Sequence, residues 1–268
     1  MPDLEHDSPN IQWWGEQQFE LNETKVWQLS SMTLSLYRGA QEWRLQYHRP
    51  AFPHHHEQTW QQLDTETALP QPIQTQRFMF KKTSERFYLL PRLADRSVVI
   101  KPVHPIMIPA GQRGTLYIST PLWVAGFEHS QKEALFDLPA ITPKDTWFGP
   151  DRLSGEMCYA TPVDGSTELS LLPPRAFRAV TPVHFHNTTN ALLRLERMNV
   201  PVTALPLFHS ESTGRLWTSQ IKVLHDNPER APRIRIESRT PPQAGQVVAL
   251  QPPRAPASAL FNMFDSFF

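Results

Sequence analysis

Hydrophobic and polar residues alternate in short runs along most of the chain. Between residues 32 and 47 the apolar positions are Met32, Leu34, Leu36, Trp43, Leu45 and Tyr47. A four-residue break, 38–41, contains a glycine and separates the two runs. Alternation with a period of two is typical of a strand with one buried face, and a polar break between two such runs predicts a β-hairpin.

The same pattern continues to about residue 250, with polar turns roughly every ten residues. Further strands are expected near residues 78–80, 87–90, 98–100, 116–124, 169–172, 183–185, 192–195, 202–207, 216–224, 234–236 and 247–250. Prolines at 102, 105 and 109 predict an edge or polyproline-type segment there, because proline cannot donate to a central ladder. Short strands at this spacing favour antiparallel sandwiches. We therefore predict an all-β protein with two antiparallel β-sandwich-like units, proline-rich connections and a short C-terminal helix.

Two stretches interrupt the strand pattern. Residues 51–76 are rich in His, Gln and Thr, and we interpret them as a polar loop in which Trp60 and Leu63 could form one helical turn. Residues 126–155 carry few strand signals, and 144–155 is expected to be a loop. The predicted units are therefore an N-terminal antiparallel β domain (1–150), a C-terminal sandwich-like domain (151–250) and a Pro-rich spacer with a Phe-rich tail (251–268).

The tail has its own pattern. Its apolar residues are Leu260, Phe261, Phe264, Phe267 and Phe268, which would share one face of a helix capped by Ser258. Because an isolated helix of this length is marginal in water, it must dock. Its own domain, a second subunit and a partner protein are the alternatives, and these five residues are the predicted partner-binding site.

Composition narrows the class of protein. Of 268 residues, 40% are hydrophobic, and 26 Lys and Arg balance 26 Asp and Glu, so no general attraction to nucleic acid is expected. Residues 1–15 lack the apolar core of a secretory signal, and no run approaches the roughly 18 apolar residues of a membrane span. We expect a soluble, cytoplasmic protein without direct membrane insertion. The four arginines at 230, 233, 235 and 239 are interpreted as a solvated face.

Catalytic signatures are missing from the sequence. It contains no phosphate-binding Gly-rich loop, Gly-x-Ser-x-Gly elbow, Cys-x-x-Cys pair or His-Glu-x-x-His motif, so no catalytic residue and no cofactor are predicted. The nearest approach to a metal site is His184 and His186, which point to the same side of a predicted strand. A third ligand from His104, His129 or His209 would complete a site of jelly-roll type.

Aromatic residues and the single cysteine offer further alternatives. Trp123, Trp147 and Trp217 could stack on a sugar or a base, or could fill the ends of a sandwich core. Cys158 has no basic neighbour in the sequence and is interpreted as a small buried hydrophobe.

Several short motifs resemble those of one protein family. They are Trp14-Gly15, Trp27-x-Leu29, Leu34-x-Leu36, Arg38, Glu42-Trp43-Arg44-Leu45, the proline-rich stretch 102–109, Gly149-Pro150 and Gly155. They resemble the bacterial and archaeal family of unknown function DUF432. The resemblance implies no activity, and it implies a genomic setting near small-conductance mechanosensitive channels.

Together these observations favour a non-enzymatic binding or accessory protein over an enzyme. Its expected partner is another protein, with a membrane channel as one candidate, or a second copy of the chain. The alternative is a metal-dependent enzyme or sensor of jelly-roll type that uses His184 and His186.

Overall fold

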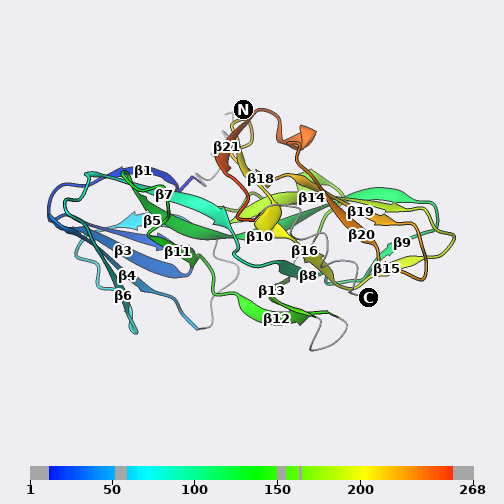
Figure 1. The fold of residues 1–268 in the computed structure, drawn as a ribbon, viewed down its shortest axis with the longest axis horizontal. Helices are drawn as coiled ribbons and strands as arrows, with labels where there is room; N and C mark the ends of the chain where they lie inside the picture. The colour runs from blue at the N-terminus through cyan, green and yellow to red at the C-terminus, as the bar shows by residue number, and fades with distance from the viewer. Residues whose placement is uncertain (1–11, 52–58, 150–154, 163–164, 256–268) are drawn as a thin grey trace, which may run out of the picture.

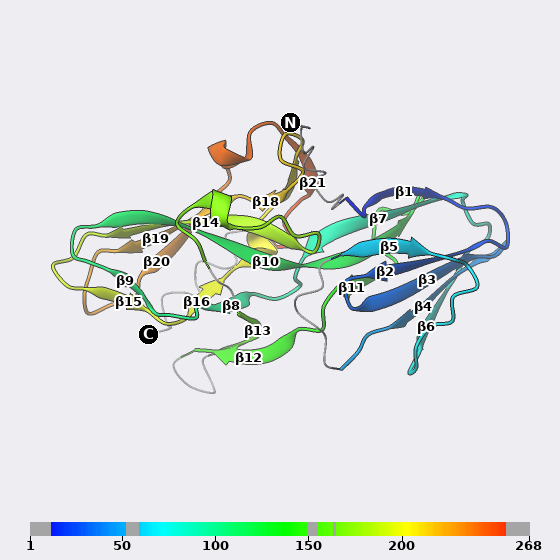
Figure 2. The ribbon, with the colours of Figure 1, turned by 180° about the vertical axis from the view of Figure 1, so that it is seen from behind.

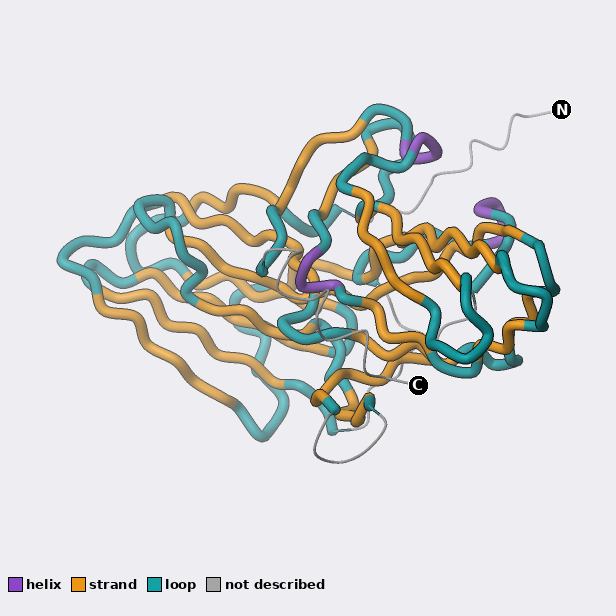
Figure 3. Tube along the Cα trace, turned by 45° about the vertical axis from the view of Figure 1, so that its right-hand side comes forward, coloured by secondary structure: helices purple, strands orange, loops and turns teal. Residues whose placement is uncertain are grey.

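The structure is a computed structural model that describes residues 12–51, 59–149, 155–162 and 165–255. Figure 1 shows an elongated molecule whose regular secondary structure is almost all strand, and Figure 2 shows it from behind. Helical structure in these ranges is confined to three short 3₁₀ turns, η1 (Leu169–Leu171), η2 (Val202–Ala204) and η3 (Pro242–Ala244), which Figure 3 shows in purple. The prediction of an all-β fold is confirmed.

A five-stranded antiparallel sheet forms one end of the molecule. Its strands, in order, are β5 (Trp60–Leu63), β2 (Thr24–Leu29), β3 (Met32–Arg38), β4 (Glu42–His48) and β6 (Gln74–Met79). The predicted hairpin is β3 and β4, in which Leu36 lies opposite Leu45. All six alternating apolar residues of this hairpin are buried, as the period of two requires.

A ten-stranded sheet runs the length of the molecule. Its main path is β1 (Gly15–Gln18), β7 (Arg86–Leu93), β10 (Arg113–Glu128), β14 (Arg178–Asn187), β18 (Leu216–Thr218), β17 (Leu207–Ser210) and β21 (Val247–Gln251). Its other strands are β11 (Phe136–Pro139), paired with β10, and β19 (Gln220–His225), which lies between β14 and β20 (Arg233–Glu237).

The long strand β10 joins the two ends of this sheet. Its first part, Arg113–Pro121, pairs with β14, and its second part, Leu122–Glu128, pairs with β7. Strands from both sides of residue 150 therefore share one sheet, and the main core cluster extends from Trp13 to Val223. The predicted division into units at residue 150 stays a prediction.

Two smaller sheets cover the C-terminal part of the large sheet. One contains β12 (Lys144–Phe148), β13 (Glu156–Pro162), β8 (Val98–Lys101) and β16 (Met198–Val200), and the other contains β15 (Leu193–Leu195) and β9 (Ile106–Ile108). Ring contacts join the layers: the ring centroids of Trp43 and Phe87 lie 4.8 Å apart, and those of Trp123 and Tyr159 lie 5.3 Å apart. The paired layers confirm a sandwich-like arrangement.

Several details differ from the sequence-based expectations. Residues 169–171 and 202–204, which were expected in strands, form the 3₁₀ turns η1 and η2. Trp60 and Leu63 lie in strand β5, not in a helical turn, and residues 144–148 form strand β12, not a loop. Both are sheet edges, and their hydrogen bonds to β2 and β13 decide their conformation more than their own hydrophobic pattern does. In addition, β8 pairs in parallel with β13, and β14 pairs in parallel with β18 and β19.

The predicted C-terminal helix and its five apolar residues, 260–268, lie outside the described residues. In the described part of the chain no helix is long and apolar enough to cross a membrane.

Candidate functional site

His184 and His186 lie on β14 with the orientation predicted from the sequence. Val183 and Phe185 between and beside them are buried in the core, so both imidazoles point to the opposite face. The two ring nitrogens of His184 are both engaged: Nδ1 lies 2.8 Å from Thr115 Oγ1, and Nε2 lies 2.9 Å from Gln220 Oε1. To bind a metal ion, His184 would have to lose one of these two hydrogen bonds.

The candidates for a third ligand are placed on separate elements. His209 on β17 packs edge-on against Trp14 at 5.3 Å, and His129, which follows β10, lies 6.0 Å from the Tyr88 ring. Among the residues that the structure describes, no three His, Cys, Asp or Glu side chains are grouped to hold a metal ion. The jelly-roll metal site stays a prediction without support from this arrangement.

A carboxylate on β20 completes the polar network beside His184. Glu237 accepts hydrogen bonds from Lys222 and Gln220 on the neighbouring strand β19. The Lys222 ammonium group is the main cause of a lowered Glu237 pKa. Glu237 is therefore ionised at neutral pH and holds Gln220 in position toward the imidazole.

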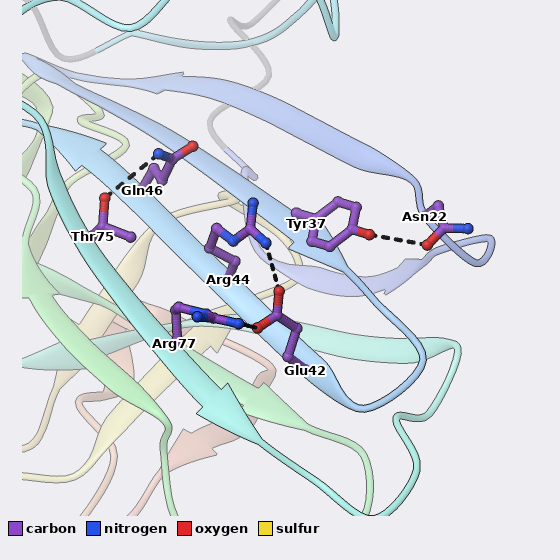
Figure 4. A network of polar contacts seen from close by, with 7 residues as sticks. All are labelled: Asn22, Tyr37, Glu42, Arg44, Gln46, Thr75 and Arg77. Carbon is purple, nitrogen blue, oxygen red and sulfur yellow. Dashed lines mark hydrogen bonds and ion pairs between the residues drawn. The ribbon is translucent and has the colours of Figure 1, made fainter.

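A second polar network covers the outer face of the five-stranded sheet (Figure 4). Glu42 lies between two arginines: Arg44 donates to it at 2.6 Å, and Arg77 Nε donates at 2.7 Å. The guanidinium of Arg44 also lies 5.0 Å from the centre of the Tyr37 ring. Hydrogen bonds from Arg77 and then Arg44 lower the Glu42 pKa, so this carboxylate is poorly suited to act as a general acid.

A third network ties the edge strand β1 to β7. Arg86 donates two hydrogen bonds of 2.7 Å to Glu16, and the Tyr88 hydroxyl donates a third at 2.8 Å. These bonds lower the Glu16 pKa to about 2, with the Arg86 bond as the largest cause. The fork geometry of the pair positions β1 at the sheet edge.

Glu128 at the end of β10 is a buried carboxylate that its sequence context does not single out from the other acidic residues. It accepts the backbone N–H groups of Ser84 at 2.9 Å and Ser130 at 2.7 Å, and also the Ser130 hydroxyl. Its carboxylate thereby joins the loop before β7 to the turn after β10.

An ion cluster fixes the chain immediately before the Phe-rich segment. Arg254 donates from Nε to the Leu93 carbonyl at 2.8 Å and from Nη1 to Asp137, and Arg92 also donates to Asp137 at 3.0 Å. The Ala255 N–H then donates to the Thr203 carbonyl at 3.0 Å. The Arg254 side chain is only 15% exposed. The sequence shows no local signal for this cluster, because its members are far apart along the chain.

Two sequence-based alternatives can now be judged. Trp123 and Trp217 are buried, so they cannot join Trp147 in a stacking platform; Trp147 itself is 38% exposed. Cys158 is buried, and burial is the main cause that raises its thiol pKa to about 12. The interpretation of Cys158 as an inert small hydrophobe agrees with this environment.

Comparison with known proteins gives a family but no activity. The family model described as protein of unknown function DUF432 matches residues 13–267 of the chain. No curated protein and no solved structure matches it. The match covers every strand from β1 to β21, and the chain belongs to the DUF432 family.

Proposed function

We propose that this protein is a non-enzymatic cytoplasmic accessory protein that binds another protein through its Phe-rich segment. The observation that carries this proposal is the anchor at residues 254 and 255. Arg254 and Ala255 attach the chain to β7, to β11 and to the turn η2 directly before the segment begins. An ordered attachment point is what a presented binding segment requires, because it reduces the conformational entropy lost on binding.

The segment itself supplies the apolar surface. Four phenylalanines and Leu260 lie within residues 260–268, where the only charged residue is Asp265. Side chains of this kind are the anchors of helix-in-groove recognition, in which an apolar face enters a hydrophobic groove. Covalent geometry keeps Leu260 within about 17 Å of Ala255, so a partner must approach this region of the body.

The occupant proposed for this segment is an apolar groove on a different protein. A membrane channel is the candidate that the family association implies. A second copy of the chain and the protein's own body are the competing outcomes of the test below.

Site-specific photo-crosslinking distinguishes these outcomes. The photoreactive amino acid p-benzoylphenylalanine replaces Phe264 in the full chain expressed in its native host, and adducts are identified by mass spectrometry. Leu171, an apolar residue that is 70% exposed on η1, is the control position. We expect a discrete adduct with a second polypeptide from position 264 and none from position 171.

The adduct should disappear in the double variant Phe261→Ser/Phe268→Ser, while the thermal unfolding temperature of the protein stays unchanged. Adducts confined to the chain that carries the label would show that the segment docks on its own body, and the proposal would then be wrong. An adduct with a second copy of the chain would replace the accessory role by self-association.

A further inference from the structure

Arginine, lysine and histidine side chains from four strands gather on one outward face of the large sheet, at the end opposite the five-stranded sheet. This basic face consists of Arg113 (β10), His184 and His186 (β14), Lys222 (β19), and Arg233 and Arg235 (β20). In Figures 1 and 2 the strands β10, β14, β19 and β20 lie side by side in this region.

The register places these residues in two rows across the strands. One row runs from Thr115 through His184 and Lys222 to Arg235. The next row runs from Arg113 through His186 and Leu224 to Arg233. Paired residues of neighbouring strands point to the same side of a sheet, so the two rows form one surface.

Burial on the other side of the same strands shows that this surface faces outward. Val183, Phe185, Ile221 and Val223 alternate with the basic-face residues and are all buried in the main core. Arg113, Lys222, Arg233 and Arg235 are exposed, and His184 and His186 are half-buried.

The carboxylates on this face leave two arginines uncompensated. Lys222 is paired with Glu237, and Arg233 is paired with Asp226. Arg113 and Arg235 form no ion pair within the described part of the chain. The whole chain is neutral by formal charge, so this local excess of positive charge is a property of the fold and not of the composition.

We infer that the basic face binds an extended acidic segment of another protein, with carboxylates at alternate positions. Residues two apart on a strand, such as Arg233 and Arg235, repeat about every 6.6 to 6.8 Å. An extended peptide presents alternate side chains at the same repeat, so a Glu-x-Glu segment lying along β20 places one glutamate at Arg235 and the other at Arg233, where it replaces Asp226 as the ion-pair partner. Guanidinium groups then bind carboxylates in their preferred fork geometry.

The chemistry of this face favours a protein segment over other polyanions. A lipid surface is usually bound by cations together with inserted apolar side chains, and the rows contain one apolar residue, the half-buried Leu224. Single-stranded nucleic acid is usually bound by cations together with stacking Phe, Tyr or Trp rings, and neither row contains one of these three residue types. The inference is independent of the Phe-rich segment, because the anchor at Arg254 involves β7 and β11 and none of these six side chains.

Fluorescence anisotropy with a synthetic peptide tests the inference on the full-length protein. The probe is a fluorescein-labelled peptide in which Glu and Thr alternate, and a peptide of the same composition with its glutamates in one block is the comparison. Arg113→Gln/Arg235→Gln removes the two uncompensated cations from the face. Lys81→Gln/Lys82→Gln removes two exposed cations that follow β6, at the far end, and is the matched control.

We expect the alternating peptide to bind more tightly than the blocked one and to dissociate as ionic strength rises toward about 0.15 M. Arg113→Gln/Arg235→Gln should weaken binding about tenfold, because the losses of affinity from two exposed charge contacts multiply. The lysine double variant should leave the affinity unchanged. Crosslinking from position 264 should be the same in both variants, which separates this result from the function proposed above.

Three results would overturn the inference. The first is the absence of binding, or an equal loss in the two double variants. The second is equal binding of the two peptides, because the spacing argument then fails. The third is tighter, arginine-dependent binding of vesicles that contain phosphatidylserine, or of an oligothymidylate, which would assign the face to lipid or to nucleic acid.

Discussion

Replacing Arg254 with methionine tests the anchor on which the proposed function depends. Methionine keeps much of the length of the side chain but removes the hydrogen bond to Leu93 and the ion pair with Asp137. Arg92 remains bonded to Asp137 at 3.0 Å, so the carboxylate keeps one partner. Burial and then the charge of Arg254 lower the Arg92 pKa, and the substitution relieves the second of these effects.

The expected loss of stability follows from these contacts. A hydrogen bond from a charged donor contributes about 1.5 to 3 kcal/mol, and the lost ion pair is partly offset by the relief of repulsion between the two guanidinium groups. We therefore expect Arg254→Met to lower the free energy of unfolding by about 2 kcal/mol. Asp137→Asn should cost more, about 3 kcal/mol, because it leaves two half-buried cations without a carboxylate.

The double variant gives the sharpest result. Once Asp137 is neutral, removing Arg254 also removes an uncompensated charge, so the combined loss should be smaller than the sum of the single losses by about 1 kcal/mol. Urea unfolding followed by tryptophan fluorescence measures all three values, because Trp13, Trp27, Trp43 and Trp217 are fully buried reporters. Arg239→Met, at an exposed arginine without an ion pair in the described part of the chain, is the control. Wild-type stability in Arg254→Met, or strict additivity, would refute the reasoning.

Three further predictions concern the other polar networks. Glu128→Gln should lower the free energy of unfolding by about 2 kcal/mol, because an amide cannot accept all the N–H and O–H donors that meet the carboxylate; urea unfolding should show no such loss for the exposed Glu85→Gln. His184→Ala should cost about 1 kcal/mol through its two lost hydrogen bonds, and stoichiometric metal in untagged protein that disappears in this variant would contradict a purely structural role. Because the Glu16 pKa falls from 4.5 to about 2, its contribution to stability is complete above pH 4.5 and is lost as the pH falls toward 2. The free energy of unfolding of Glu16→Gln should therefore fall less between pH 4.5 and pH 2 than that of the wild-type protein. The same dependence of stability on pH in the two proteins would contradict this prediction.

The sequence predicts a strand correctly where apolar and polar residues alternate within that strand. The hairpin of β3 and β4 and the orientation of His184 follow from alternation alone, since an outward position always follows an inward one. The edge strands β5 and β12 could not be found this way. Of their residues only Phe148 is buried, and their conformation depends on the neighbouring strands β2 and β13.

The candidate sites were less predictable because they depend on register between distant strands. The row of arginines on β20 was visible in the sequence, and its exposure agrees with the expected solvated face. Its position beside His184 required the parallel pairing of β14 with β19, which no local pattern specifies. The sequence likewise places Arg254 in the predicted Pro-rich spacer, and only the tertiary structure brings its side chain to Asp137.

The position of the Arg254 anchor has a consequence for the proposed function. Leu93 and Asp137 belong to β7 and β11, next to the five-stranded sheet, whereas the anchored residues follow β21 at the other end of the strand order. The attachment of the Phe-rich segment thus depends on the folding of both parts of the large sheet. If a partner binds the Phe-rich segment as proposed, it contacts residues that follow this attachment, and its binding energy adds to the free energy that holds the two parts of the sheet together. A saturating partner should therefore raise the urea midpoint of the wild-type protein more than that of Arg254→Met, and equal shifts would show that the anchor plays no part in presenting the segment.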